Sequence, residues 1–203
     1  MKKTILLVYL IVACTSVQNT EDNQITNDFL RILNSNQLVI KNLKPDNYEL
    51  SKNLNDGPFQ YNYALRNKTN GTEIRYHINS FKDKIDQYEE FLKNNPNAFI
   101  IKPNDNSYAQ DFILILMNLA GDNPKIKSNP LPEKILLNVF NANWGSNSLF
   151  EFDPKLNFSY KYCNLIVIHK NETADAYIYF LGNELRLTLE ASSEFFENLK
   201  FKK

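Results

Sequence analysis

The chain has 203 residues, of which 43% are hydrophobic and 13% aromatic, and its 23 basic residues balance its 23 acidic residues. This composition indicates a folded globular chain rather than a disordered one, and it lacks the basic excess that nucleic-acid binding usually requires. Two cysteines and two histidines exclude a disulfide framework and a zinc site of Cys and His ligands.

The N-terminus has the pattern of an export signal. Met1-Lys2-Lys3 is a short basic start, and the run Thr4–Ala13 is almost entirely apolar. A helix that spans a bilayer needs about 20 apolar residues. A secretory signal instead combines a basic start, a shorter apolar run and a small residue at the cleavage site. Residues 1–13 are therefore predicted to be a signal peptide.

The end of this segment, Ile11-Val12-Ala13-Cys14, resembles the lipobox of bacterial lipoproteins. The resemblance implies cleavage between Ala13 and Cys14 and attachment of a diacylglyceryl group to the Cys14 thiol. Buried acyl chains contribute about 0.8 kcal/mol per CH₂, so this anchor would be effectively permanent. Because Thr15 rather than Asp follows the cysteine, the resemblance favours the outer membrane of the cell envelope. An ordinary signal peptide that carries Cys14 by chance is the alternative.

Residues 14–24 are mostly polar and lack apolar periodicity, which predicts a tether between anchor and domain. Residues 25–203 contain no repeat, low-complexity tract or linker, so a single globular domain is expected. It begins with Ile25, Phe29 and Leu33, whose spacing predicts an amphipathic helix.

Two runs of alternating apolar and polar residues flank a turn at Asn70-Gly71. This pattern predicts a β-hairpin with one buried face. The apolar positions are Tyr61, Tyr63, Leu65, Ile74, Tyr76 and Ile78. Arg66, Arg75 and His77 are expected on the opposite face.

Three helices are predicted next. The apolar positions from Phe81 to Leu92 recur at helical spacing. The run Phe112–Leu119 is apolar almost all round, which indicates a buried helix, with a central strand as the competing interpretation. Pro132 can open a third helix at its first turn. Asn143-Trp144-Gly145 then predicts a turn.

The C-terminal part predicts a second hairpin, from Tyr160–Lys170 and Ala174–Leu181, with burial on both faces. Leu149–Phe152 is a further predicted strand. Apolar positions from Leu185 to Leu199 suggest a C-terminal helix. The chain as a whole therefore predicts an α+β domain with an antiparallel sheet packed with helices, for which a three-layer α/β/α sandwich is one arrangement.

Two stretches, Tyr61–Ile78 and Phe140–Phe180, look like a group of uncharacterised bacterial lipoproteins with no assigned activity. The order of elements is also similar to that of the Mog1/PsbP-like fold, an antiparallel sheet between helices. The resemblance implies that architecture, but it brings no catalytic residues, and a fold does not imply a function.

His169, Cys163 and Asp175 are residue types of a nucleophile arrangement. His169 and Cys163, however, are six positions apart on one strand, or about 20 Å at 3.3 Å per residue. An inert buried cysteine and a hydrogen-bonded histidine are therefore expected. Glu151 and Asp153 would share a strand face, where such pairs bind calcium or act as acid and base. A solvated strand edge is the alternative we favour.

Trp144 and Asn143 are the candidate residues of a ligand cleft, and a core tryptophan at a helix–strand corner is the alternative. The tyrosines at alternate strand positions are expected to pack the sheet rather than to form a ligand platform. No catalytic residue, metal site or cofactor is predicted.

These observations favour a non-enzymatic envelope lipoprotein that is anchored through Cys14 and binds an envelope protein or component. Such a protein is expected to expose an apolar or aromatic patch. One alternative is a hydrolase or carbohydrate-binding enzyme with a dispersed site. The other is an immunity or inhibitor lipoprotein that neutralises a toxin.

Overall fold

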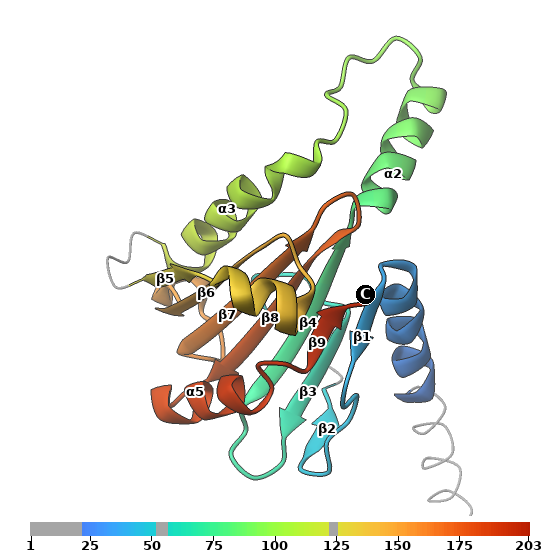
Figure 1. Cartoon of the computed structure of the whole chain (residues 1–203). Helices are drawn as coiled ribbons and strands as arrows, with labels where there is room; N and C mark the ends of the chain where they lie inside the picture. Colours follow the sequence, from blue (N-terminus) through green and yellow to red (C-terminus); the bar gives the residue numbers. More distant parts are fainter. Residues whose placement is uncertain (1–21, 52–56, 122–125) are drawn as a thin grey trace, which may run out of the picture.

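The computed structural model describes residues 22–51, 57–121 and 126–203. In this part of the chain, seven antiparallel strands form the main sheet in the order β2-β3-β4-β8-β7-β6-β5, and a small sheet pairs β1 with β9 (Figure 1). The strands of the main sheet are β2 (Tyr48–Leu50), β3 (Tyr63–Asn67), β4 (Glu73–Ser80), β5 (Lys127–Pro130), β6 (Trp144–Glu151), β7 (Tyr162–Lys170) and β8 (Ala174–Gly182). The small sheet consists of β1 (Leu38–Ile40) and β9 (Leu199–Phe201). The predicted α+β class is confirmed.

The helices accompany this sheet in sequence order. They are a first helix over residues 22–35, α2 (Phe81–Asn94), α3 (Tyr108–Ala120), α4 (Glu133–Ile135), which continues into a π-helical turn (Leu136–Phe140), and α5 (Leu185–Glu194). Short 3₁₀ turns lie at Asp105–Ser107 and Pro154–Leu156. Residues 22–24 are already helical, although they were predicted to belong to the tether.

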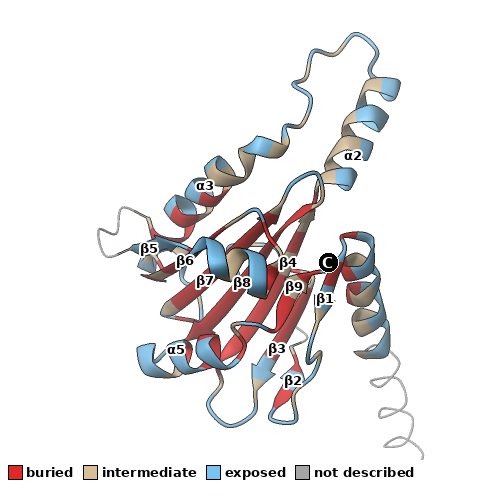
Figure 2. Cartoon of the chain, viewed as in Figure 1, coloured by how far each residue is buried: buried red, intermediate tan, exposed pale blue. Residues whose placement is uncertain are grey.

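Strand β8 lies at the centre of the main sheet, and every one of its nine residues is buried. Side chains alternate between the two faces of a strand, so burial along the whole of β8 requires cover on both faces. One face, here called the α5 face, is covered by the first helix, the small sheet, the π-helical turn and α5. The other, the α3 face, is covered by α3. The layers therefore form the expected α/β/α sandwich (Figure 2).

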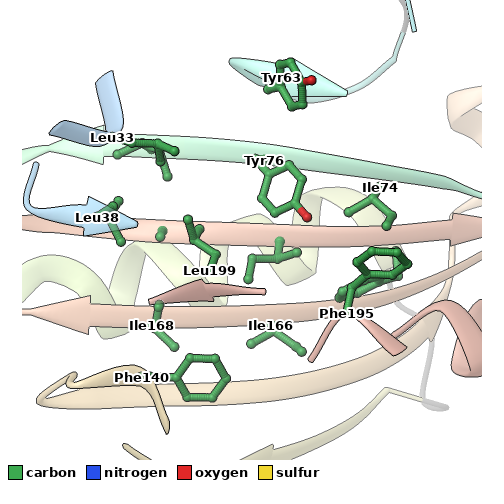
Figure 3. Packing of buried hydrophobic residues seen from close by; sticks show 14 of the residues in the cluster. Leu33, Leu38, Tyr63, Ile74, Tyr76, Phe140, Ile166, Ile168, Phe195 and Leu199 are labelled. Atoms are coloured by element: carbon green, nitrogen blue, oxygen red, sulfur yellow. The ribbon is translucent and has the colours of Figure 1, made fainter. Parts of the chain in front are cut away.

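The α5 face holds the larger apolar core (Figure 3). Phe29 of the first helix is fully buried and stacks on Tyr63, with ring centroids 4.6 Å apart and planes 2° apart. Tyr76 pairs with Tyr63 across β3 and β4, and its ring centroid lies 5.8 Å from that of Phe29. Tyr177 and Tyr179 are buried on the α3 face. These tyrosines pack the sheet, as was predicted from their alternation.

Both predicted hairpins are present. Gly71 has a φ of 70° in the turn between β3 and β4, where Asn67 accepts hydrogen bonds from the backbone of the next residues. One expectation was wrong, because the opposite face of β4 is also covered and Arg75 there is fully buried. Tyr61 does not lie with Tyr63, since its ring contacts the Arg75 guanidinium at 4.4 Å.

Two predicted local structures were wrong. Trp144 and Gly145 do not form a turn but begin β6, where Trp144 pairs with His169 of β7. The chain turns earlier, at Asn141, which has a φ of 50°. The C-terminal helix ends at Glu194, and Leu199 belongs to β9, where it pairs with Ile40. Helical spacing and a helix followed by a short strand place apolar residues at similar intervals, so the pattern did not distinguish them.

Replacing Phe29 by Ala tests the packing of the first helix on the sheet. Removal of this fully buried ring loses the free energy gained by transferring it from water to the core, and it leaves a cavity. We therefore expect the free energy of unfolding to fall by about 3–5 kcal/mol. Urea denaturation measures this loss. The matched control, Phe99→Ala, removes a 95% exposed ring and is expected to stay within about 0.5 kcal/mol of the original chain. Equal effects of the two changes would show that the first helix does not pack as described.

Candidate functional site

Residues 81–120 leave one end of the main sheet as an arm, of which α2 and the connecting segment project beyond the strands and α3 returns to the sheet (Figure 1). This α2–α3 arm consists of α2, a connecting segment and α3. It begins where β4 ends, because the Ser80 hydroxyl accepts a hydrogen bond from the Asp83 backbone at 3.2 Å and so caps α2. No residue of α2 is buried, which makes α2 unlike the other long helices of the described chain.

The arm exposes large apolar side chains. Phe99 and Ile101, in the connecting segment, are 95% and 86% exposed. On α3, Ile113, Leu114 and Met117 are each more than half exposed, while the opposite side of the helix packs on the sheet. The predicted helix is therefore confirmed, but its predicted burial holds for one side only. Together these five residues are called the apolar arm surface.

A polar cluster fixes the root of the arm to the sheet. His169 is buried at the end of β7, and its Nδ1 lies 2.7 Å from Asp175 Oδ1 on the paired position of β8. Its Nε2 lies 3.2 Å from Asn171 Oδ1 in the β7–β8 turn. The ring of Tyr108, the first residue of α3, stacks on the imidazole at a centroid distance of 4.0 Å. Both ring nitrogens and one ring face of His169 are thus occupied by the fold.

Charged residues complete this root cluster. Lys84 Nζ of α2 lies 3.7 Å from Asp175 Oδ2 and 3.6 Å from Asp111 Oδ2 of α3. Asp105, in the 3₁₀ turn before α3, accepts a hydrogen bond of 2.7 Å from the Glu172 backbone. The cluster therefore joins α2, α3 and the β7–β8 turn at one point. Sequence patterns did not reveal it, because Lys84, Asp105 and Asp111 come from helices and loops far from His169 in the chain.

Two buried polar atoms beside the root cluster have no hydrogen-bond partner within the described residues. They are His77 Nδ1 and Tyr177 Oη, from paired positions of β4 and β8. Burial lowers the pKa of His77, although the Asp175 carboxylate opposes this effect and Lys84 adds to it. Burial likewise raises the pKa of Tyr177. Both side chains are therefore held in their neutral forms near pH 7.

The predicted candidates divide between the two ends of the sheet. His169 and Asp175 do meet, whereas Cys163 lies near the opposite end of β7. Cys163 is fully buried, and burial raises the pKa of its thiol, so it is the inert core residue that was expected. The contacts of the buried His169 therefore join the β7–β8 turn to the arm.

The pair Glu151 and Asp153 does not form a shared carboxylate face. Glu151 ends β6, but Asp153 follows the strand and caps the next 3₁₀ turn by accepting from the Lys155 backbone at 2.9 Å. The strand ends because the chain turns at this point. No group of three potential metal-ligating side chains occurs among the residues that the structure describes.

Trp144 and Asn143, the predicted cleft residues, are occupied by contacts within the fold. The indole lies against Tyr108 and Phe112 of α3, with centroids 5.1 Å and 5.5 Å away. The Asn143 side chain accepts a hydrogen bond of 2.9 Å from the Asn171 backbone. These contacts favour the alternative of a tryptophan that packs at a helix–strand corner, and they give no support to a cleft.

Ala13 and Cys14, the predicted cleavage and lipidation residues, lie outside the described residues. Among the described helices, none has both the length and the apolar character needed to cross a membrane. Comparisons of the chain with protein-family models, curated proteins and solved structures found no match.

Replacing Asp175 by Ala tests the root cluster. The change leaves His169 Nδ1 buried without its partner and removes a carboxylate that faces Lys84. We expect a loss of about 1–3 kcal/mol in the free energy of unfolding, the cost of a buried unsatisfied polar group. We also expect faster hydrogen exchange in α2 and the first turns of α3, measured by mass spectrometry. Unchanged exchange in α2 and α3 would show that the cluster does not hold the arm.

The lowered pKa of His77 predicts a pH dependence of stability. The unfolded chain takes up a proton at His77 near its ordinary pKa of 6.5, whereas the folded chain resists it. Stability that is present above pH 6.5 is therefore lost as the pH falls toward the lower folded pKa. A His77→Phe variant, compared with the original chain by urea denaturation across this range, should lose less stability on acidification. Parallel curves for the two chains would contradict this expectation.

Proposed function

We propose that this protein is a lipid-anchored protein of the bacterial envelope that binds an apolar segment of a partner protein through the α2–α3 arm. The observation that carries the proposal is the exposure of Phe99 and Ile101 at the far end of the arm. The same arm also exposes Ile113, Leu114 and Met117. Exposed apolar side chains are typical of an interaction surface, whereas the hydrophobic effect in folding favours their burial.

The chemistry of the arm supports an apolar occupant. The solvent-facing side of α3 combines its three exposed apolar residues with the uncharged Gln110 and Asn118. An uncharged surface of this kind suits the apolar face of a helix or an extended apolar segment. The connecting segment adds Phe99, and a large aromatic side chain is a frequent anchor at protein interfaces.

The direction of the arm supports a protein rather than the bilayer as the occupant. The first described helix starts at Asp22, at the end of the molecule opposite the arm in Figure 1. Seven residues lie between Asp22 and the proposed anchor at Cys14, and the eight Cα–Cα steps span at most about 28 Å when extended. A membrane held at that end would have the arm pointing away from it, toward other envelope components.

The anchor and the arm are tested in the same cells. Labelling with radioactive palmitate should mark the original chain and leave the Cys14→Ser variant unlabelled. A photo-crosslinking residue at position 99 or 101 should form one protein adduct. The matched control places the same residue at position 186, an exposed site on α5. The adduct should disappear when Ile113→Asp and Met117→Asp are combined in the crosslinking chain, because both changes put charge on the apolar arm surface.

Other adducts would overturn this proposal. Crosslinking to labelled phospholipid alone would make the bilayer the occupant of the arm. An adduct of twice the chain's own mass would make it a self-association surface. An equal adduct from position 186 would mean that the arm has no specific role. Palmitate labelling that persists in the Cys14→Ser variant would contradict the proposed anchor independently of these results.

A further inference from the structure

A polar cavity of about 390 Å³ lies at the end of the main sheet opposite the arm. It forms where the turn between β3 and β4 meets the connection from β8 to α5. The residues that matter for its chemistry are Ser51, Arg66, Glu73, Tyr160 and Glu184. The volume falls at the lower end of the range for small-molecule sites, which is about 300–1,000 Å³.

The floor of the cavity is a preorganised carboxylate. Glu73 is buried at the start of β4, and its Oε1 accepts a hydrogen bond of 2.5 Å from Arg75 Nε. Its Oε2 accepts hydrogen bonds from Tyr160 Oη at 2.9 Å and from Ser51 Oγ at 3.3 Å. Burial and the adjacent carboxylate raise the pKa of Tyr160, so the phenol keeps its proton and its hydroxyl donates a hydrogen bond to Glu73. The Glu73–Arg75 pair is neutral as a unit and rigidly held.

The walls carry two oppositely charged side chains. Arg66 of β3 lies opposite Glu73 of β4 in the strand register, and Glu184 immediately precedes the first residue of α5. Neither side chain takes part in an ion pair or a side-chain hydrogen bond with the other described residues, and they do not pair with each other. Glu184 also does not cap α5 with its side chain. One cavity therefore has both a cationic and an anionic side chain in its lining.

This charge arrangement selects the ligand class. A simple anion would pair with Arg66 but would be repelled by Glu184. A simple cation would pair with Glu184 but would be repelled by Arg66. A neutral sugar would leave both charges unpaired, and the buried Tyr160 offers it no exposed aromatic face for stacking. We propose that the cavity binds a zwitterion of the size of a free amino acid or dipeptide, whose carboxylate pairs with Arg66 and whose ammonium group pairs with Glu184. An arginine guanidinium can bind a carboxylate through two parallel hydrogen bonds, which also fixes its orientation.

Isothermal titration calorimetry on the purified full chain tests this assignment. The probes are the free L-amino acids and dialanine. Each amino acid that binds is then compared with its N-acetyl form, which lacks the ammonium group, and its amide, which lacks the carboxylate. We expect at least one amino acid or dialanine to bind. Loss of either charged group should weaken binding by roughly tenfold, the effect of about 1.4 kcal/mol.

Variants assign the binding to the cavity. Arg66→Gln and Glu184→Gln should each weaken the bound zwitterion by roughly tenfold without altering the fold, since both side chains are exposed. Glu89→Gln, an exposed site on α2, is the matched control and should have no effect. The assignment is overturned if no zwitterion binds, if acetate binds as tightly as the amino acid, or if Glu184→Gln leaves the affinity unchanged. None of these results depends on the anchor or the arm.

Discussion

The fold depends on the burial of β8 on both of its faces. All nine residues of this strand are buried, and its neighbours β4 and β7 are buried along most of their length. Alternate side chains of a strand point in opposite directions, so such a strand cannot lie at the surface of a two-layer domain. The chain covers one face with the first helix, the small sheet and α5, and the other with α3.

Two-sided burial also forces polar residues of the central strands into covered positions. β4 carries Glu73, Arg75 and His77 on the α3 face, and β8 carries Asp175 there. A buried charge is tolerated only where partners satisfy it. At one end of the sheet the partners of Glu73 form the floor of the polar cavity. At the other end, the partners of Asp175 form the root of the arm. The two proposed sites therefore have one structural cause, at opposite ends of the same strands.

Local sequence patterns predicted the elements in which apolar residues recur regularly over many positions. The hairpins β3–β4 and β7–β8 alternate over many residues, and the helices α2 and α3 keep a helical spacing, so their types were predicted correctly. The edge strand β5 was missed, because its residues Lys127–Pro130 are all exposed and carry no apolar alternation. The extent of β6 was also missed. Trp144 joins that strand through pairing with β7, which is a contact between distant parts of the chain.

The candidate sites were less predictable, for a related reason. The predicted hairpin places His169 and Asp175 on either side of its turn, and the structure brings them together. The contribution of Lys84 depends on the direction in which α2 leaves the sheet, which no local pattern contains. The cavity likewise combines Arg66 and Glu184 from elements that meet only in the folded chain. Periodicity reports burial on one element, whereas a site is made by several elements.

The way in which the arm is held bears directly on what it can bind. An element that is fixed by apolar packing must bury its apolar side chains, and α3 does so on the side that carries Phe112 and Leu116. α2 buries none, and its root is held instead by Lys84 and the carboxylates that face it. Polar contacts thus hold the root of α2, and apolar packing holds the inner side of α3, while Phe99, Ile101 and the outer side of α3 stay in water. The outer side of α3 therefore carries an exposed apolar surface, typical of an interaction site, on a helix whose inner side is anchored to the sheet.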